Sequence, residues 1–191
     1  KMKLLKDRII NDGQVIGTEI IKVDSFLNHQ IDVALVFKIG EELANRFENQ
    51  EITKILTIEA SGIPIACAVA WHMKNLPVIF AKKAAPSTMI DGFYNTEITS
   101  FTKRTVSSVM VSKKYILKED KVLIVDDFLA HGEAALGLAY LAEQAGAVVS
   151  GIGIAIEKEF QGGREKLRQK GYRVESLAVI KSIENGHITF K

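Results

Sequence analysis

The sequence predicts an α/β fold in which helices flank a central parallel sheet. The first observation is that residues 121–125 form a continuous apolar run, as expected of a strand buried on both faces. The second is that a helical apolar pattern over about 133–144 leads into another apolar run over 148–156. The third is that such runs and helical patterns alternate along most of the chain. Strand, helix and strand in this order indicate parallel strands joined by right-handed crossovers.

Apolar spacing and turn residues define the other elements. Residues 2–12 place apolar side chains at helical spacing, and Gly13 ends that helix. Asp32 is the expected N-cap of a longer helix. The apolar stripe of that helix comprises Val36, Ile39, Leu43 and Phe47. The other predicted strands cover 18–23, 54–58, 77–81, 107–111, 174–180 and 187–190. The other predicted helices run from the turn at 59–62 to about residue 74 and over 161–170.

Residues 82–104 interrupt this alternation. They contain no long apolar period and are rich in polar and turn residues, which predicts a long loop or hairpin with a short strand near 97–101. Long loops in compact domains often act as lids. We therefore expect this segment to be a mobile loop beside the binding site.

Composition limits the classes of function that the chain can serve. With 191 residues, the chain is expected to form one domain over 1–191. The net charge of +2 argues against an extended nucleic-acid surface, and no apolar run approaches the ~20 residues of a membrane helix. We expect a cytoplasmic protein that binds neither nucleic acid nor membrane. The single cysteine, Cys67, excludes an internal disulfide and is expected to be a small buried hydrophobe.

Two adjacent acids, Asp126 and Asp127, follow the apolar run 121–125. Ligands of open parallel sheets bind beyond the carboxyl ends of the strands. There, two neighbouring carboxylates need hydroxyl donors or a cation to offset their repulsion. The loop 130–134 contains small residues and opens a helix, so its backbone N–H groups form an anion site. This combination suits a sugar phosphate, with the acids facing ribose hydroxyls. The plainer alternative is that both acids only cap the turn.

The string over 122–134 resembles the phosphoribosyl pyrophosphate (PRPP) signature of type I phosphoribosyltransferases, in which four apolar residues precede two acids and a phosphate loop. It is most similar to the xanthine branch of this family, which carries Asn and Gln where this chain has His131 and Glu133. The resemblance extends over nearly the full chain. Its other segments are 22–30, 59–62, 100–103, 151–158 and 171–178.

The resemblance implies a type I phosphoribosyltransferase fold. It implies a small hood, formed mainly by residues 1–30 and the C-terminal part, and a mobile loop over about 82–104. The implied activity is purine salvage, in which the 5-phosphoribosyl group of PRPP is transferred to N9 of xanthine. The products would be xanthosine 5′-monophosphate and pyrophosphate. Mg²⁺ bound with PRPP and a homodimer are implied in the same way, whereas no direct side-chain ligand for a metal is expected.

The resemblance also implies a role for each candidate site residue. Asp126 and Asp127 are the expected catalytic residues beside the ribose hydroxyls. The expected 5′-phosphate loop comprises Ala130, His131, Gly132, Glu133 and Ala134. The expected purine contacts are Ile21, Asn28 and Lys158. The expected pyrophosphate contacts are Glu59, Ala60, Ser61, Gly62, Lys82, Lys83 and Lys103. The plainer alternatives are a strand-end acid for Glu59 and solvated loop positions for the lysines.

Chemistry supports the role of Lys158 independently. An ammonium group only donates hydrogen bonds, so it favours a 6-oxo purine over the 6-amino group of adenine. Xanthine, guanine and hypoxanthine all satisfy this condition, and the sequence leaves guanine or hypoxanthine open as the preferred base. No residue stands out as a general base, because the position of a third loop acid in related enzymes is Ala130 here.

The two departures in the phosphate loop leave further alternatives. Glu133 adds a negative charge where a phosphate is expected to bind, and we expect its side chain to point to solvent. His131 is expected to donate a hydrogen bond to the phosphate. Two alternatives to an active enzyme remain. The protein is a weakened PRPP binder, or it is a non-catalytic PRPP-sensing regulator of the same fold. The regulator is disfavoured because residues 1–17 are too few for a winged helix.

Overall fold

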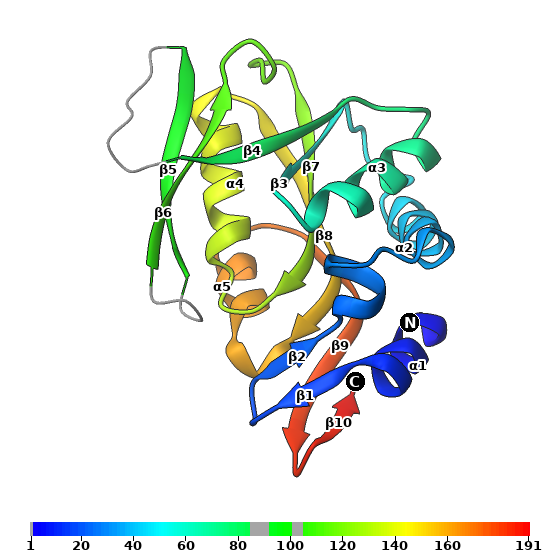
Figure 1. Cartoon of the computed structure of the whole chain (residues 1–191). Coiled ribbons are helices and arrows are strands. Elements are labelled where there is room, and N and C mark those ends of the chain that lie inside the picture. The colour runs from blue at the N-terminus through cyan, green and yellow to red at the C-terminus, as the bar shows by residue number, and fades with distance from the viewer. Residues whose placement is uncertain (1, 85–91, 101–104) are drawn as a thin grey trace.

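The computed structural model describes residues 2–84, 92–100 and 105–191 (Figure 1). The helices are α1 (Lys3–Asp12), α2 (Val33–Arg46), α3 (Gly62–His72), α4 (Glu133–Gln144) and α5 (Gly163–Gln169), with a π-helix η1 (Asp24–Asn28) and a 3₁₀ turn η2 (Glu159–Gln161). The strands are β1 (Gln14–Ile16), β2 (Ile20–Lys22), β3 (Lys54–Ile58), β4 (Val78–Ala84), β5 (Phe93–Ser100), β6 (Thr105–Ser112), β7 (Lys121–Leu129), β8 (Val148–Lys158), β9 (Val174–Glu184) and β10 (His187–Phe190). Within the described ranges, no helix is both long and apolar enough to cross a membrane.

The main sheet has the strand order β10-β9-β8-β7-β3-β4-β6-β5. Neighbouring strands from β9 to β4 are parallel, which confirms the central parallel sheet. The outer strands are antiparallel: β10 pairs with β9, and the β5–β6 hairpin pairs with β4 through β6. The sheet is therefore mixed, and the carboxyl ends of β3, β4, β7 and β8 lie along one edge.

Side chains alternate between the two faces of the sheet, and each face has its own hydrophobic cluster. On β7, Leu123 and Val125 join the cluster formed with α1, α2 and α3. Val122 and Ile124, from the same strand, join the cluster formed with α4 and α5. Figure 1 shows these two helical layers on opposite sides of the sheet. Because both faces are covered, β7 needs a continuous apolar run rather than an alternating one.

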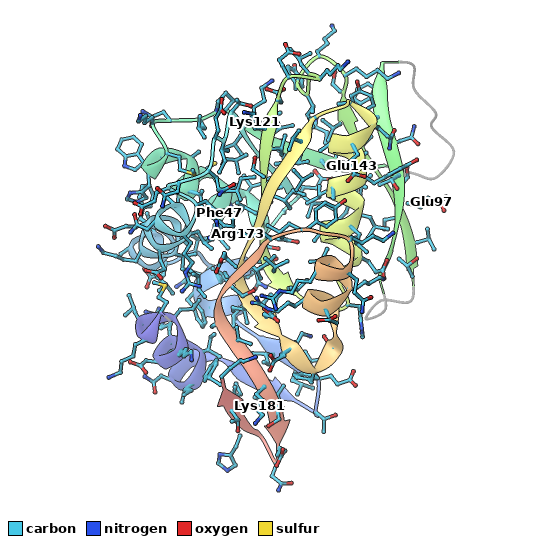
Figure 2. All side chains as sticks on the ribbon, turned by 180° about the vertical axis from the view of Figure 1, so that it is seen from behind. Phe47, Glu97, Lys121, Glu143, Arg173 and Lys181 are labelled. Atoms are coloured by element: carbon cyan, nitrogen blue, oxygen red, sulfur yellow. The ribbon has the colours of Figure 1, made fainter. Side chains whose placement is uncertain are left out.

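Helix α2 forms as the sequence predicts. The side chain of Asp32 accepts a 3.0 Å hydrogen bond from the Leu35 N–H and caps the helix. The predicted stripe is buried as far as Phe47, the residue that follows the helix. The Phe47 ring fits against Gly151, where an added Cβ would lie 2.3 Å from ring carbon Cε1. The guanidinium carbon of Arg173 lies 4.9 Å from the centre of the same ring, as Figure 2 shows from behind.

The segment expected to form the hood lies beside the C-terminal strands. Helix α1, the β1–β2 hairpin and η1 are next to β9 and β10 in Figure 1. The ammonium group of Lys6 on α1 donates a 2.8 Å hydrogen bond to the carbonyl of Lys191, at the opposite end of the chain. The strand predicted over 18–23 is confirmed as β2, and the sequence analysis missed its partner β1, which pairs with it after Gly17 turns the chain with a φ of +63°.

Three further expectations differ from the structure. Strands β7 and β8 continue past the predicted ends, to Leu129 and Lys158, because they pair with each other along this whole length. Within 82–104, the predicted hairpin and its strand near 97–101 are confirmed by β5 and its pairing with β6, but β5 begins earlier, at Phe93, and residues 82–84 belong to β4. Residues 85–91 and 101–104 lie outside the described ranges. Cys67 is exposed on α3 rather than buried, because it lies on the side of the helix that faces away from the sheet.

Candidate active site

A cleft of about 350 Å³ opens at the carboxyl ends of β3, β4 and β7. Its walls are the residues at those strand ends, the loop 130–134 and the first turn of α4. The β5–β6 hairpin contributes Ile98, Thr99, Ser107 and Val109 to the opposite wall. The position agrees with the general rule for ligands of parallel sheets.

Asp126 and Asp127 lie at the floor of this cleft, within β7 rather than in the turn after it. Both are buried, with 6% and 8% of their surface exposed. The Asp127 N–H donates a 2.9 Å hydrogen bond to Oδ1 of Asp126. Burial and the neighbouring charge of Asp127 raise the pKa of Asp126 well above its ordinary value, while the positive charge of Lys83 opposes this rise. Residues that only capped a turn would not need this costly burial.

The residues after β3 form a second wall of the cleft. Glu59 Oε1 accepts a 2.6 Å hydrogen bond from the N–H of Lys83, which fixes the end of β3 against β4. Glu59 and Ser61 line the cleft, whereas Ala60 is exposed and Gly62 is buried. The Glu59–Ala60 peptide bond is cis.

Gly62 is required by close packing at the start of α3. A Cβ added there would lie 2.1 Å from Oγ1 of Thr57 and 3.0 Å from Oδ1 of Asp126. The Thr57 hydroxyl is buried and has no hydrogen-bond partner in the described part of the chain. A side chain at position 62 would therefore clash with Thr57 and crowd Asp126.

The candidate lysines separate on the two faces of β4. Lys83 lines the cleft, close enough to Asp126 to affect its pKa. Lys82 points to the other side, where it lies 6.0 Å from the centre of the Phe80 ring and borders a different pocket. The structure therefore brings Lys83 but not Lys82 into the cleft, as the alternation of side chains along a strand requires. Lys103 lies outside the described residues.

The loop 130–134 lines the cleft throughout, and Gly132 occupies the N-cap position of α4 with a φ of +86°. Segment 161–163 supports this loop from behind. The Gly163 N–H donates to the Ala130 carbonyl at 3.1 Å, and Nδ1 of His131 lies 3.1 Å from the Gln161 carbonyl oxygen. Nδ1 of His131 is thus engaged by segment 161–163, and the expected role of His131 as a phosphate donor stays a prediction.

Glu133 does not point freely to solvent as expected. Its carboxylate forms an ion pair with the ammonium group of Lys166 on α5, and it also lines the cleft. Its side chain is 28% exposed. The expectation failed because Lys166 is 33 positions away in the chain, and only the packing of α5 against the loop brings the charges together.

The expected purine contacts lie beside the cleft rather than in its lining. Nζ of Lys158, at the end of β8, donates a 3.0 Å hydrogen bond to the Glu19 carbonyl in the hood. It also lies 6.0 Å from the centre of the Phe128 ring. Burial lowers the pKa of Lys158, and the charge of Glu19 partly opposes this change. Phe128 also lines the cleft that contains the two acids, so Lys158 lies next to a residue of the cleft wall.

The two hood residues differ in exposure. Ile21 on β2 is almost fully buried in the cluster shared with α1 and α2, so it contributes shape and no polar contact. Asn28 is exposed at the end of η1, and its side-chain amide is accessible to a ligand. The structure thus places both in the same N-terminal segment as the Glu19 carbonyl, to which Lys158 donates its hydrogen bond.

Sequence reasoning missed three contributions to the site. Arg164 pairs with the buried Glu157, the residue before Lys158. Thr99 and Ser107 reach the cleft from the β5–β6 hairpin. No local signal marks Thr99 and Ser107, because only the packing of the hairpin beside the cleft brings them to the site. A signal for Arg164 was available in Glu157, an acid on a buried strand, since a buried carboxylate requires a cation.

Comparisons with known proteins agree with this geometry. A family model described as the phosphoribosyl transferase domain matches residues 23–186. A xanthine phosphoribosyltransferase of Clostridium novyi is 57% identical over 190 residues, which is 100% of each chain. One from Ruminiclostridium cellulolyticum is 56% identical, covering 99% of each chain. One from Bacillus cytotoxicus is 52% identical, covering 99% of this chain and 95% of the relative.

Solved structures with similar folds are adenine phosphoribosyltransferases. That of Thermoanaerobacter pseudethanolicus has a TM-score of 0.67 and 27% identity, covering 78% of this chain and 81% of its own. That of Trypanosoma brucei, solved with AMP, pyrophosphate and ribose-5-phosphate, has a TM-score of 0.74 and 18% identity. It covers 94% of this chain and 80% of its own, and at this identity the likeness concerns the fold alone.

Proposed function

The chain belongs to the phosphoribosyltransferase family, next to relatives named xanthine phosphoribosyltransferase, and from this premise we propose that it transfers the phosphoribosyl group of PRPP to N9 of xanthine. The products are xanthosine 5′-monophosphate and pyrophosphate. The expected type I fold is confirmed by the family match and by the similar structures. As a member of this family the protein is a pentosyl-transferring enzyme.

One observation carries the proposal beyond family membership: the floor of the cleft carries two buried acids, and a lysine and the backbone amides of a helix terminus lie around it. The buried acids Asp126 and Asp127 face Lys83 and the amides of the loop 130–134 across a space of about 350 Å³. Cleavage of the bond between the ribose and pyrophosphate develops positive charge on the sugar and negative charge on the leaving group. A preorganised site stabilises both when it presents opposite charges to the two ends.

Each of these groups has a distinct part in this reaction. The carboxylates of Asp126 and Asp127 accept hydrogen bonds from the ribose hydroxyls and stabilise positive charge on the sugar ring. The loop amides, at the positive end of α4, bind the 5′-phosphate. Lys83 and the polar groups of Glu59–Gly62 contact the departing pyrophosphate. The ammonium group of Lys158 donates to the 6-oxo group of the base, in exchange for its bond to the Glu19 carbonyl.

Mg²⁺ is proposed to enter with PRPP. The site fits it because two buried acids repel each other there, and a cation would offset that repulsion. Asp126 and Asp127 are the residues that would hold it, through bound water rather than as direct side-chain ligands. An ion of this kind keeps several waters and binds substrate oxygens. When bound, Mg²⁺ neutralises charge on the pyrophosphate.

The test is an assay of pyrophosphate release. The purified protein is mixed with PRPP and Mg²⁺, and xanthine, guanine, hypoxanthine or adenine is added separately. We expect release to be fastest with xanthine and slowest with adenine. If release is faster with guanine or hypoxanthine, that base is the preferred substrate instead of xanthine, and the proposed role of Lys158 is unchanged. An absence of release with every base would refute the proposed activity.

We also propose that the protein is a homodimer and acts in the cytoplasm, as the resemblance implies. Light scattering coupled to size-exclusion chromatography measures the first property, and a mass of 21.1 kDa in solution would contradict it. Fractionation of the source cells measures the second.

A further inference from the structure

The loop that is proposed to bind the 5′-phosphate contains an acidic side chain. Glu133 is the first residue of α4, and its carboxylate lies in the wall of the cleft. The backbone amides at the same helix terminus favour an anionic ligand. A phosphate bound there would be repelled by an uncompensated carboxylate, so the loop amides and Glu133 act in opposite directions on the same ligand.

Lys166 supplies the compensating charge from another element. Its ammonium group pairs with Oε1 of Glu133, and both side chains are only partly exposed. Helix α5 is held against the loop by the hydrogen bond from the Gly163 N–H to the Ala130 carbonyl. The contact is so close that a Cβ at position 163 would lie 2.3 Å from the Ala130 oxygen. The backbone of α5 is therefore fixed relative to the loop, and the exposed side chain of Lys166 reaches Glu133 from this fixed helix.

We infer that Lys166 is a positioning residue for PRPP, which neutralises Glu133 and so allows the loop 130–134 to accept the 5′-phosphate. The inference rests on the proposed function, because it concerns how that site binds its phosphorylated substrate. Lys166 acts through Glu133 rather than on the phosphate itself. The two residues therefore form an interdependent pair.

A double-mutant cycle tests this interdependence. Lys166→Met leaves Glu133 unpaired, and we expect the KM for PRPP to rise about fivefold, the upper end of the effect typical of a charge near a helix terminus. The kcat is expected to change less than twofold. Glu133→Gln alone should lower the KM, because it removes the carboxylate that repels the phosphate and keeps the charge of Lys166. The double variant, Glu133→Gln with Lys166→Met, should bring the KM back to within about twofold of the wild type. Lys170→Met, at the exposed end of the same helix, is the matched control.

Binding of ribose 5-phosphate, measured by calorimetry, separates this inference from the proposed activity. This probe carries the 5′-phosphate without the pyrophosphate and needs no turnover. If the wild type binds it but releases no pyrophosphate with any base, the proposed activity fails while the cycle still decides the role of Lys166. Equal weakening in Lys166→Met and in the double variant would show that Lys166 contacts the phosphate directly, which overturns the inference. Unchanged affinity in Lys166→Met would overturn it as well.

Discussion

Arg164 on α5 holds the fully buried carboxylate of Glu157 on β8 through three hydrogen bonds of 2.5, 2.8 and 2.9 Å. A fourth bond, 3.0 Å long, runs from Nη1 of Arg164 to the Val174 carbonyl on β9. The pair fastens α5 to the strand end that carries Lys158, while Gly163 and Lys166 of the same helix contact the loop 130–134. One short helix therefore connects this loop to the strand end that carries Lys158.

Loss of this ion pair should destabilise the whole domain. Arg164→Met leaves a buried, unpaired carboxylate, and we expect the free energy of unfolding to fall by about 3–5 kcal/mol. Urea unfolding measures the change, with the exposed Arg168→Met as the control on the same helix. A loss below about 0.5 kcal/mol would place Arg164 among ordinary surface residues.

Asp126→Asn should abolish turnover and stabilise the fold. The substitution removes a charge whose burial and whose repulsion with Asp127 are both unfavourable, so we expect a gain of about 1 kcal/mol at pH 8, typical of relieved strain at a functional site. Thermal unfolding and pyrophosphate release measure the two effects. A variant that keeps turnover would remove Asp126 from the mechanism.

The stabilisation by Asp126→Asn should depend on pH with a defined sign. The pKa of Asp126 is raised in the folded state above its ordinary value of 3.8, so the folded protein binds the proton more tightly than the unfolded chain. The wild type therefore loses stability as pH rises from about 3.8 through the folded-state pKa. The difference in unfolding free energy between variant and wild type should be largest above that pKa. It should fall toward zero as the pH approaches 4. A difference that widens at low pH would contradict this assignment.

Lys158→Met should impair the use of 6-oxo purines selectively. Loss of a charged hydrogen-bond donor is expected to lower kcat/KM for xanthine about 10- to 100-fold, with little further effect on adenine. The matched control is Lys181→Met, an exposed lysine on β9 (Figure 2). Initial rates with each base give the comparison. An equal loss with xanthine and adenine would indicate that Lys158 serves the fold rather than the choice of base.

Gly163→Ala should affect PRPP binding from outside the cleft. The added Cβ would lie 2.3 Å from the Ala130 oxygen and 2.9 Å from the Gly132 nitrogen. Both are backbone atoms, so the loop or α5 must move, and we expect a rise in the KM for PRPP together with a destabilisation of about 1–3 kcal/mol. Steady-state kinetics and thermal unfolding measure the two effects. Destabilisation with an unchanged KM would show that α5 moves to accommodate the methyl group while the loop keeps its conformation.

Local sequence was enough to predict the elements that bury a regular face. The stripe of α2, its cap at Asp32 and the apolar run of β7 each follow from spacing that is visible within a few residues. The adjacent acids Asp126 and Asp127 also marked the site, because acids at the end of a buried strand are unusual unless they have a function. The ends of β7 and β8 were placed too early, because pairing between the two strands overrides the polar residues at their ends.

The sequence by itself determined the parallel α/β core, the acids and the small-residue loop after β7, because these depend on local periodicity and on residue chemistry. Only the tertiary structure decided which charges face each other. It brought Lys83 into the cleft and turned Lys82 away, and it paired Glu133 with Lys166. These arrangements depend on contacts between residues distant in the chain. Burial and electrostatic interaction act through space, so the positions of such partners become defined only when the chain has folded.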